Sequence, residues 1–197
     1  MHTSINYQRV PDAQIWNDFL GGSRDAYAFM YEKYARVLYN YGYKIAQDRQ
    51  LTEDCLQDLF LAILETRERL GPTDSIKYYL MRALRRELVR KLNRQHRFAD
   101  SADDVDFRIV FHYEPTWLDA QISRERSDAL LHELNQLPAR QKEALFLKFF
   151  DNLSYDQIAG MMGIETTSAY KIIYKAIASL QKRMPADLLV LLFILSW

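Results

Sequence analysis

The chain has 197 residues, 49% of them hydrophobic, and its 26 basic and 26 acidic residues give a formal net charge of zero. This composition predicts a folded globular protein and argues against a disordered chain or one that coats nucleic acid through bulk charge. The single cysteine excludes an internal disulfide, and the scattered histidines show no metal-ligand spacing, so we expect neither a metal nor another cofactor. Residues 1–14 lack the apolar core of a signal peptide, which indicates a cytoplasmic location.

Apolar residues recur at three- and four-residue spacing through most of the chain, which predicts an all-α fold. Glycine and proline at residues 21–22 and 71–72 interrupt the first helical block, Pro138 stands near the start of a helix in the second, and Pro185 ends that block. The acidic stretch between the blocks is longer than a usual connection inside a compact domain. We therefore expect two small helical domains, 10–98 and 123–184, joined by an acidic linker, 99–122, and followed by an apolar tail, 185–197.

The segment 52–65 has the pattern of an amphipathic helix, with Thr52 as a candidate N-cap. Its expected buried face is formed by Leu56, Leu59, Phe60, Ile63 and Leu64. The outward face holds acidic residues around Leu61, namely Asp54, Asp58 and Glu65. Such a face can dock on a basic helix of a partner or be an ordinary solvated surface, and periodicity alone favours neither interpretation.

The segment 76–94 predicts a basic helix that contains a single acid, Glu87. Every fourth residue is leucine, at positions 80, 84, 88 and 92, and an arginine stripe lies roughly opposite, at Arg82, Arg86 and Arg90. Tyr78 and Tyr79 stand at its start, beside a loop at residues 70–75. Aromatic rings next to cations suit stacking on an unpaired base, while the alternative is a solvated arginine face with tyrosines in the core.

The segment 153–184 has the organisation of a helix-turn-helix. Ser154 and Gln157 form a candidate capping box for the first helix, which carries Ile158, Ala159 and Met162 inward. Gly163 suits a left-handed turn, Ile164 is expected to fill the core between the helices, and Thr166 is a candidate cap for the second helix.

On the second helix of this segment, one side gathers apolar residues: Ala169, Ile172, Ile173, Ala176 and Leu180. The other side is left with hydroxyls, lysines and one exposed aromatic: Thr167, Ser168, Lys171, Tyr174 and Lys175. Such a face can reach phosphates and base edges in the major groove of DNA. The alternative is a helical hairpin with a solvated face.

These segments together resemble the extracytoplasmic-function (ECF) group of the sigma-70 family of RNA polymerase sigma factors. The stretch DAYAFMYEKYARVLYNYGYKIAQDRQLTEDCLQDLFLAIL looks like the opening helices of the sigma-2 domain. This resemblance implies that core RNA polymerase is contacted by Asp54, Gln57, Asp58 and Leu61. The acidic stretch falls where the family has its inter-domain linker, and the chain has no room for the extra domain of larger sigma factors.

The stretch SIKYYLMRALRRELVRKLNRQHR is similar to the helix that recognises and melts the promoter −10 element, after a loop that captures a flipped base. The resemblance assigns the −10 region to Tyr78, Tyr79, Arg82, Arg86 and Arg90. The family usually has tryptophan at the position of Tyr79 and asparagine at that of Arg86.

The stretch LNQLPARQKEALFLKFFDNLSYDQIAGMMGIETTSAYKIIYKAI is similar to the sigma-4 domain, which recognises the −35 element. The resemblance assigns this recognition to Thr167, Ser168, Lys171, Tyr174 and Lys175. Lysine is common in the family at the position of Tyr170, and arginine at that of Lys175.

The resemblance implies an ECF-type sigma factor that directs promoter recognition, promoter melting and transcription initiation. Its expected partners are core RNA polymerase and promoter DNA, with an anti-sigma factor as a further candidate. The apolar run 188–195 is too short to span a bilayer, so we expect no membrane insertion. The chain offers no constellation typical of an enzyme. Two alternatives remain: a helix-turn-helix regulator that binds duplex DNA without polymerase, and a helical interaction protein without a nucleic-acid role.

Overall fold

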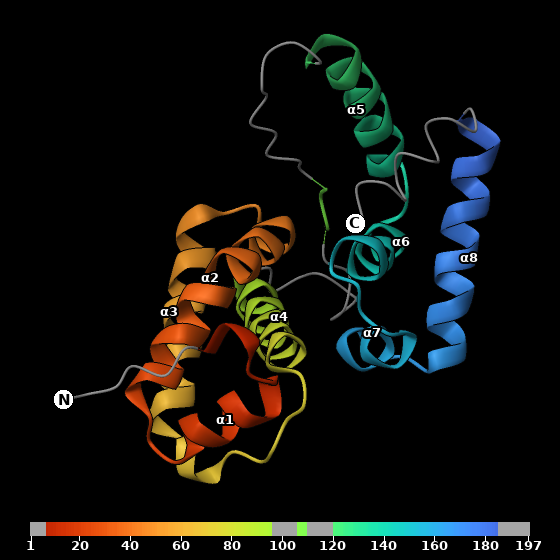
Figure 1. Ribbon diagram of the computed structural model, residues 1–197. Coiled ribbons are helices and arrows are strands. Elements are labelled where there is room, and N and C mark those ends of the chain that lie inside the picture. Colours follow the sequence, from red (N-terminus) through yellow and green to blue (C-terminus); the bar gives the residue numbers. More distant parts are fainter. Residues whose placement is uncertain (1–6, 96–105, 110–119, 185–197) are drawn as a thin grey trace. The chain divides into compact units, whose positions relative to one another are not determined.

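The computed structural model describes residues 7–95, 106–109 and 120–184. The chain divides into two compact units, Met1–Ala102 and Asp103–Trp197 (Figure 1). Every regular element within the described residues is a helix or a helical turn. The prediction of an all-α fold with two small helical units is therefore confirmed. Among these residues, no helix combines the length and the apolar content needed to cross a membrane.

The first unit is a bundle of long helices, in which α2 (Arg24–Ala46), α3 (Arg49–Glu65) and α4 (Ile76–Gln95) each pack against the other two. A short helix, α1 (Asp12–Leu20), lies against α2 and also contacts α4. The 3-10 turns η1 (Tyr7–Arg9) and η2 (Arg67–Arg69) complete the unit. The breaks between α1 and α2 and between α3 and α4 coincide with the glycine and proline positions that predict them.

Gly42 of α2 lets the three long helices meet closely. A Cβ atom added there would lie 3.1 Å from Thr52 of α3, 3.2 Å from Leu88 of α4 and 3.3 Å from Leu84 of α4. These separations are shorter than ordinary van der Waals contact. Glycine at this position therefore brings the backbone of α2 against both partner helices.

Helix α3 begins one turn earlier than the sequence indicates. Its N-cap is Asp48, whose side chain accepts a hydrogen bond from the Leu51 amide at 3.0 Å. The expectation that Thr52 caps this helix is wrong, because Thr52 is buried inside the first turn and its hydroxyl donates to the Asp48 carbonyl at 2.6 Å. Aspartate and threonine are both good caps, and only the folded chain distinguishes them.

The buried face of α3 is also narrower than expected. Leu56, Leu59, Phe60 and Ile63 are buried, but Leu64 is 42% exposed. At 100° per residue, Leu64 lies about 80° around the helix from Leu56 and so at the border of the buried face. The expectation that Leu64 belongs to the core is therefore wrong.

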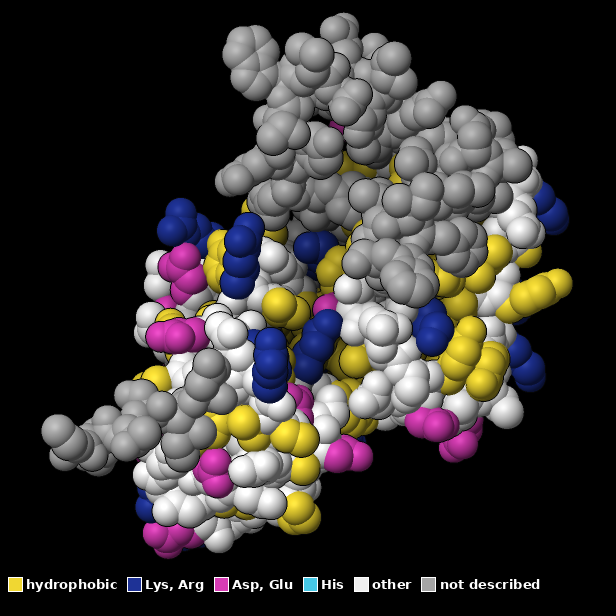
Figure 2. Space-filling view, in the orientation of Figure 1, with side chains coloured by type: hydrophobic (Ala, Val, Ile, Leu, Met, Phe, Trp, Pro, Cys, Tyr) yellow, Lys and Arg dark blue, Asp and Glu magenta, His cyan; other side chains and the backbone are white. Residues whose placement is uncertain are grey.

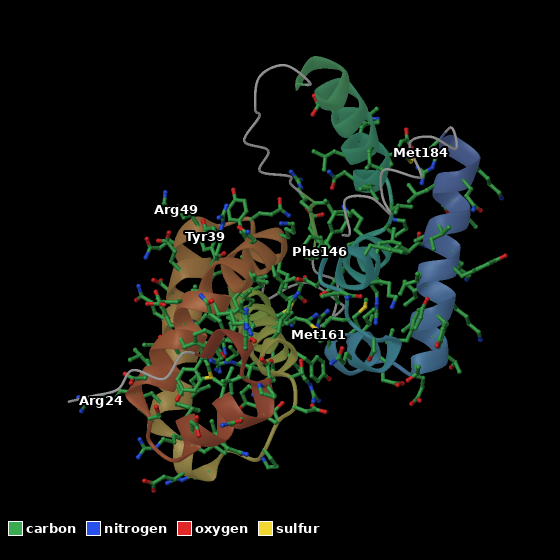
Figure 3. The ribbon with its side chains drawn as sticks, viewed as in Figure 1. Arg24, Tyr39, Arg49, Phe146, Met161 and Met184 are labelled. Atoms are coloured by element: carbon green, nitrogen blue, oxygen red, sulfur yellow. The ribbon has the colours of Figure 1, made fainter. Side chains whose placement is uncertain are left out.

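The second unit is built from α5 (Ala120–Asn135), α6 (Ala139–Leu145), α7 (Tyr155–Met162) and α8 (Thr166–Arg183). Helix α6 starts directly after Pro138 and continues into a π-helical segment, η3 (Phe146–Phe150). Helix α8 packs on α6 and α7 and also contacts α5. Two of the side chains that fill this unit are labelled in Figure 3 and are both buried, Phe146 and Met161.

Helices α7 and α8 form the expected helix-turn-helix. The Ser154 side chain accepts from the Gln157 amide at 3.1 Å, and the Gln157 side chain accepts from the Ser154 amide at 2.9 Å, so the capping box is confirmed. Gly163 ends α7 in the left-handed conformation, at φ 64°. Thr166 is not the cap of α8: Glu165 occupies that position, and the Thr166 hydroxyl instead donates to Asp156 of α7 at 2.8 Å.

Residues 106–109, which the sequence places within the linker, are anchored on the second unit. Phe107 and Ile109 are buried, whereas Asp106 and Arg108 between them are exposed. The Phe107 ring lies 5.6 Å from the ring of Phe146. The side-chain amide of Asn135 at the end of α5 accepts from the Ile109 amide at 3.1 Å and donates to the Ile109 carbonyl at 2.9 Å. Pro185 and the apolar run 188–195 lie outside the described residues.

Candidate interfaces for a partner protein and for nucleic acid

The acidic face of α3, defined here as Asp54, Gln57, Asp58 and Leu61, is exposed along its whole length. These positions are spaced i, i+3, i+4 and i+7, so they share one side of the helix. Leu61 is 55% exposed. The Asp54 carboxylate accepts from the Gln50 side chain at 2.9 Å, which orients it outward within the same helix. The structure thus brings together all four residues that the sequence assigns to a protein partner.

Two further apolar side chains extend this face and are not identified from the sequence. Leu64 follows one turn after Leu61 and is itself exposed. Tyr31 of α2 is also exposed, and its ring packs edge-on against the Phe60 ring of α3 at 4.9 Å. Because Tyr31 belongs to α2, the spacing of residues along α3 cannot predict that it lies beside this face. The surface therefore combines carboxylates with a larger apolar area than one leucine provides.

The face is connected to α4 by a side-chain contact. The Lys91 ammonium group donates to the Asp58 carboxylate at 2.8 Å. This hydrogen bond is the main reason that the pKa of Lys91 is raised above its ordinary value. Both side chains are partly in contact with solvent, so the pair contributes little to stability and can exchange partners readily.

The arginine stripe of α4, formed by Arg82, Arg86 and Arg90, is exposed. On the opposite side Leu80, Leu84 and Leu88 are completely buried, while Leu92 at the end of the pattern is only half-buried. The Arg90 guanidinium donates to the Glu87 carboxylate at 2.9 Å, so part of its charge is compensated. The alternation of buried leucine and exposed arginine gives α4 one core side and one cationic side.

The aromatic end of α4 is held by α1. Tyr79 is half-buried, and its ring lies 4.8 Å from the ring of Trp16 with an angle of 56° between the planes. Burial raises the pKa of Tyr79, and Arg86 acts in the opposite direction. Trp16 is completely buried, and its indole NH donates to the Gly71 carbonyl at 2.9 Å. Tyr78 is also half-buried and its backbone amide faces the Ser75 hydroxyl at 3.4 Å.

Asp12 supplies a second connection between α1 and α4. Its carboxylate accepts from the backbone amide of Ile76, the first residue of α4, at 2.9 Å. The Tyr34 hydroxyl donates to both oxygens of this carboxylate, at 3.0 and 3.1 Å. Lys33 approaches the carboxylate at 3.4 Å. Asp12 therefore supplies an acceptor to the first backbone amide of a helix that begins 64 residues later in the sequence.

The outer face of α8 presents the residues that the sequence assigns to DNA. Thr167, Lys171, Tyr174 and Lys175 are exposed, Ser168 is half-buried, and Tyr174 reaches 75% exposure. The opposite side buries Ala169, Ile173, Ala176 and Leu180, while Ile172 is half-buried. Figure 2 shows hydrophobic and basic side chains close together on the surface over α8. This mixture suits a surface that contacts both phosphates and the apolar parts of DNA.

Tyr170 has a role within the helix-turn-helix. Its ring stacks on the ring of Tyr155 of α7 at 3.6 Å, with only 18° between the planes. The Lys148 ammonium group lies 4.8 Å from the centre of the Tyr155 ring. Beside this stack lies a hollow of about 350 Å³, lined by Tyr155, Tyr170, Lys171, Ile173, Tyr174 and Ile177. Tyr170 thus joins α7 to α8 and borders the face that carries the lysines.

Comparison with protein-family models identifies the two units. The model of sigma-70 region 2 matches residues 30–98, and the model of sigma-70 region 4 matches residues 127–180. The chain belongs to the sigma-70 family. Region 2 thus covers most of α2 with α3 and α4, and region 4 covers the later part of α5 through most of α8. Helix α1, with Asp12 and Trp16, precedes the part that region 2 matches.

Curated relatives place this sigma factor in the ECF group. It is 23% identical to RNA polymerase sigma factor YlaC of Bacillus subtilis over 164 residues, which cover 82% of this chain and 93% of that protein. It is 24% identical to ECF RNA polymerase sigma factor BldN of Streptomyces coelicolor over 84% of this chain, but spans only 63% of BldN. It is 26% identical to RNA polymerase sigma factor CarQ of Myxococcus xanthus, over 77% of this chain and 84% of that protein.

Solved structures share the fold. The sigma factor RpoE of Bartonella quintana, in complex with the anti-sigma factor NepR, superposes with a TM-score of 0.57 at 20% identity, covering 79% of this chain and 94% of RpoE. CnrH in complex with the cytosolic domain of CnrY gives a TM-score of 0.58 at 16% identity, covering 89% of this chain and 98% of CnrH.

Four residues of this sigma factor differ from those usual in the family, and their structural surroundings are of two kinds. Tyr79, where the family usually has tryptophan, is packed against Trp16. Tyr170, where lysine is common, is used in the stack with Tyr155. Arg86 and Lys175 instead point into solvent. The two aromatic departures are thus accommodated by packing, whereas the two cationic ones lie on exposed faces.

Proposed function

We propose that this ECF sigma factor binds core RNA polymerase through the acidic face of α3, and that it contacts promoter DNA through α4 and α8. The observation that carries the proposal is the chemical difference among three exposed helix faces of one chain. One is acidic with an exposed leucine, one is an arginine stripe beside half-buried tyrosines, and one carries hydroxyls, lysines and a tyrosine. Each suits a different partner surface.

The acidic face offers carboxylates around Leu61 to a cationic, partly apolar surface of the polymerase. Such an interface derives orientation from its charges and affinity from its desolvated apolar centre. Leu61, with Leu64 and Tyr31 as neighbours, supplies that apolar centre, and Asp54 and Asp58 supply the charge. Asp54, Gln57, Asp58 and Leu61 are accordingly the proposed polymerase contacts.

In the proposed sigma-2 domain, residues 10–98 within the first unit, α4 is the proposed site for the −10 element as its strands separate. Arg82, Arg86 and Arg90 would follow the phosphates of the non-template strand. Tyr78 and Tyr79 lie where the helix meets the preceding loop, and an unpaired base can stack there. Binding of an exposed base favours the open form of the DNA, which is the physical basis of melting.

In the proposed sigma-4 domain, residues 123–184 within the second unit, α8 is the proposed major-groove helix for the −35 element. Thr167, Ser168, Lys171, Tyr174 and Lys175 lie on its accessible side or at the edge of that side. Two weak DNA contacts on one chain, both held on the polymerase, reinforce each other through effective concentration. The neutral free protein is therefore expected to bind duplex promoter DNA only weakly.

Further parts of the proposal concern partners and location. An anti-sigma factor is a proposed regulatory partner, because RpoE of Bartonella quintana, which shares the fold, was solved with one. We place the protein in the cytoplasm, where transcription occurs in bacteria, and assign it no catalysis of its own. A helix-turn-helix regulator that acts without polymerase is not favoured, since it leaves the region-2 match and the acidic face of α3 without a role.

Transcription in vitro tests the proposal. Bacterial core polymerase is incubated with a promoter library in the presence and absence of the protein, and the transcript start sites are sequenced. Specific starts that depend on the protein are expected from promoters with a shared −10 and −35 pattern. The matched control is a variant with Asp54, Asp58 and Leu61 all replaced by alanine, which should lose these starts because it no longer joins the polymerase. Absence of specific starts with the unchanged protein would contradict the proposal.

A further inference from the structure

Two side chains of helix α1 make three contacts with the segment that precedes and begins α4. They come from Asp12 and Trp16, which are separated by one helical turn and lie on the same side of α1. The targets are the Gly71 carbonyl, the Ile76 amide and the Tyr79 ring. All three belong to the loop and the helix start where the proposed function places an unpaired base. Helix α1 lies outside the residues matched by the region-2 model.

The Asp12 contact fixes the start of α4. A helix N-terminus has unpaired amide donors, and a carboxylate that accepts from them stabilises the first turn. Asp12 accepts from Ile76 while its oxygens are held by the Tyr34 hydroxyl, which comes from the buried side of α2. The start of α4 is therefore fixed relative to both α1 and α2, and Tyr78 and Tyr79 follow within its first turn.

The Trp16 contact fixes the loop. The indole NH donates to the Gly71 carbonyl, and the same ring packs against the tilted ring of Tyr79. Trp16 is completely buried, so its ring has little freedom to move. One rigid side chain thus determines the distance between the loop backbone and the aromatic side chain across from it. Within the loop, Thr73 and Ser75 add a local contact, since the Ser75 amide donates to the Thr73 hydroxyl at 3.3 Å.

We infer that Asp12 and Trp16 are positioning residues, which hold the loop 70–75 and the start of α4 in the arrangement that captures a base. A binding site that is already ordered before the ligand arrives avoids the loss of conformational entropy on binding. The inference rests on the proposed role of α4 in binding the −10 element. It assigns to α1 a contribution to promoter opening without contact between α1 and DNA.

The test measures affinity of the reconstituted holoenzyme for single-stranded oligonucleotides that contain the −10 element. Two pairs of variants separate positioning from folding. Trp16→Phe keeps an aromatic ring but removes the indole donor, and Gln14→Ala on an exposed position of α1 is its matched control. Asp12→Ala removes the acceptor of the Ile76 amide, and Asp12→Asn is the conservative variant, because its side-chain oxygen can still accept from this amide. Affinity for core polymerase and the thermal unfolding midpoint are measured for each variant.

Trp16→Phe and Asp12→Ala should each weaken binding of the intact oligonucleotide by about tenfold, while affinity for core polymerase changes less than about twofold. Asp12→Asn should recover most of the affinity, and Gln14→Ala should leave it unchanged. Abasic sites introduced one at a time should identify one position at which these variants bind as well as the wild type, because no base is left to capture.

Wild-type affinity in Trp16→Phe and Asp12→Ala would overturn the inference. So would an equal loss on the intact and on every abasic oligonucleotide, which indicates a general structural defect. Failure of the wild-type holoenzyme to bind any −10 oligonucleotide is a separate result, and it would contradict the proposed function of α4 itself.

Discussion

The ammonium group of Lys91 lies 2.8 Å from the carboxylate of Asp58 and joins the basic helix α4 to the acidic face of α3. The same carboxylate is proposed to meet the polymerase, so a cation of the partner and Lys91 compete for its oxygens. The contact between Lys91 and Asp58 can thus change the affinity of the acidic face of α3 for the polymerase.

Asp58→Ala and Lys91→Ala are expected to have different effects on polymerase binding. Asp58→Ala removes a charge from the interface and should weaken binding by about tenfold. Lys91→Ala frees the carboxylate and should leave the affinity equal or up to about fivefold higher, the range of an exposed ion pair. Titration of fluorescently labelled protein with core polymerase measures both. A loss of affinity in Lys91→Ala as large as that in Asp58→Ala would show that the pair acts structurally.

Leu61→Ala and Leu59→Ala separate binding from folding on a single helix. Leu61 is exposed, so its truncation should change the free energy of unfolding by less than about 0.5 kcal/mol while it weakens polymerase binding. Leu59 is buried, so its truncation should cost about 2–5 kcal/mol of stability. Urea unfolding and polymerase titration give the two quantities. Unchanged polymerase affinity in Leu61→Ala would remove this residue from the proposed interface.

Arg86→Gln is expected to reduce the salt dependence of −10 binding. Removal of one cation that neutralises a phosphate of single-stranded DNA should lower the slope of log affinity against log salt by about 0.7. Arg90→Gln should have a smaller effect, since the Arg90 guanidinium already pairs with Glu87. Arg24→Gln, an exposed arginine at the start of α2 labelled in Figure 3, is the matched control and should leave the slope unchanged. Equal slopes for Arg86→Gln and Arg24→Gln would contradict a phosphate-binding role for Arg86.

The Tyr155–Tyr170 stack should stabilise the pairing of α7 with α8. A double-mutant cycle with Tyr155→Leu and Tyr170→Leu should give a coupling energy of about 0.5–1.5 kcal/mol in the free energy of unfolding. Tyr174→Ala should leave stability nearly unchanged, because this side chain extends into solvent, but should weaken binding to −35 DNA. A coupling energy near zero would show that the two rings lie together without contributing to stability.

Alkaline pH should lower the free energy of unfolding of the first unit, because the Tyr34 hydroxyl titrates. Burial, the Asp12 charge and the hydrogen bond to Asp12 raise the pKa of Tyr34 above its ordinary value, in that order of importance. Below the unfolded pKa of about 10, the phenol is protonated in both states and its contribution to stability is complete. As the pH rises above about 10, the unfolded chain loses this proton while the folded protein retains it, so stability falls.

Tyr34→Phe provides the comparison for this pH effect. The difference in unfolding free energy between wild type and Tyr34→Phe should shrink between about pH 9 and pH 11, because phenylalanine does not titrate. Chemical unfolding at several pH values, with both proteins in the same buffers, measures it. A constant difference over this range would contradict the role of the Tyr34 proton.

Local patterns in the sequence predict the parts of the fold that depend on neighbouring residues. The leucine and arginine stripes of α4, the capping box at Ser154 and the left-handed Gly163 all involve residues a few positions apart, and all are present. The exposure of the expected contact residues on α3 and α8 also follows from helical periodicity. Leu64 departs from the pattern because it lies at the edge of the buried face, where periodicity does not discriminate.

Contacts between distant segments could not be predicted in this way. Asp12 and Ile76 are separated by 64 positions, and Tyr27 of α2 donates to the Phe60 carbonyl of α3 across 33. Phe107 and Ile109 stand in an acidic stretch, and the charge of this stretch predicts a solvated tether. The structure instead buries both side chains. Each of these features depends on how distant segments pack together, and the local residue spacing of a single sequence does not indicate that packing.

The hydrogen bonds between the Asn135 side chain and the Ile109 backbone reduce the number of residues that connect the two units. The sequence suggests a connection of more than twenty residues, but from the last residue of α4 to Asp106 only residues 96–105 intervene. Phe107, Ile109 and Asn135 therefore make part of the acidic stretch a fixed piece of the second unit.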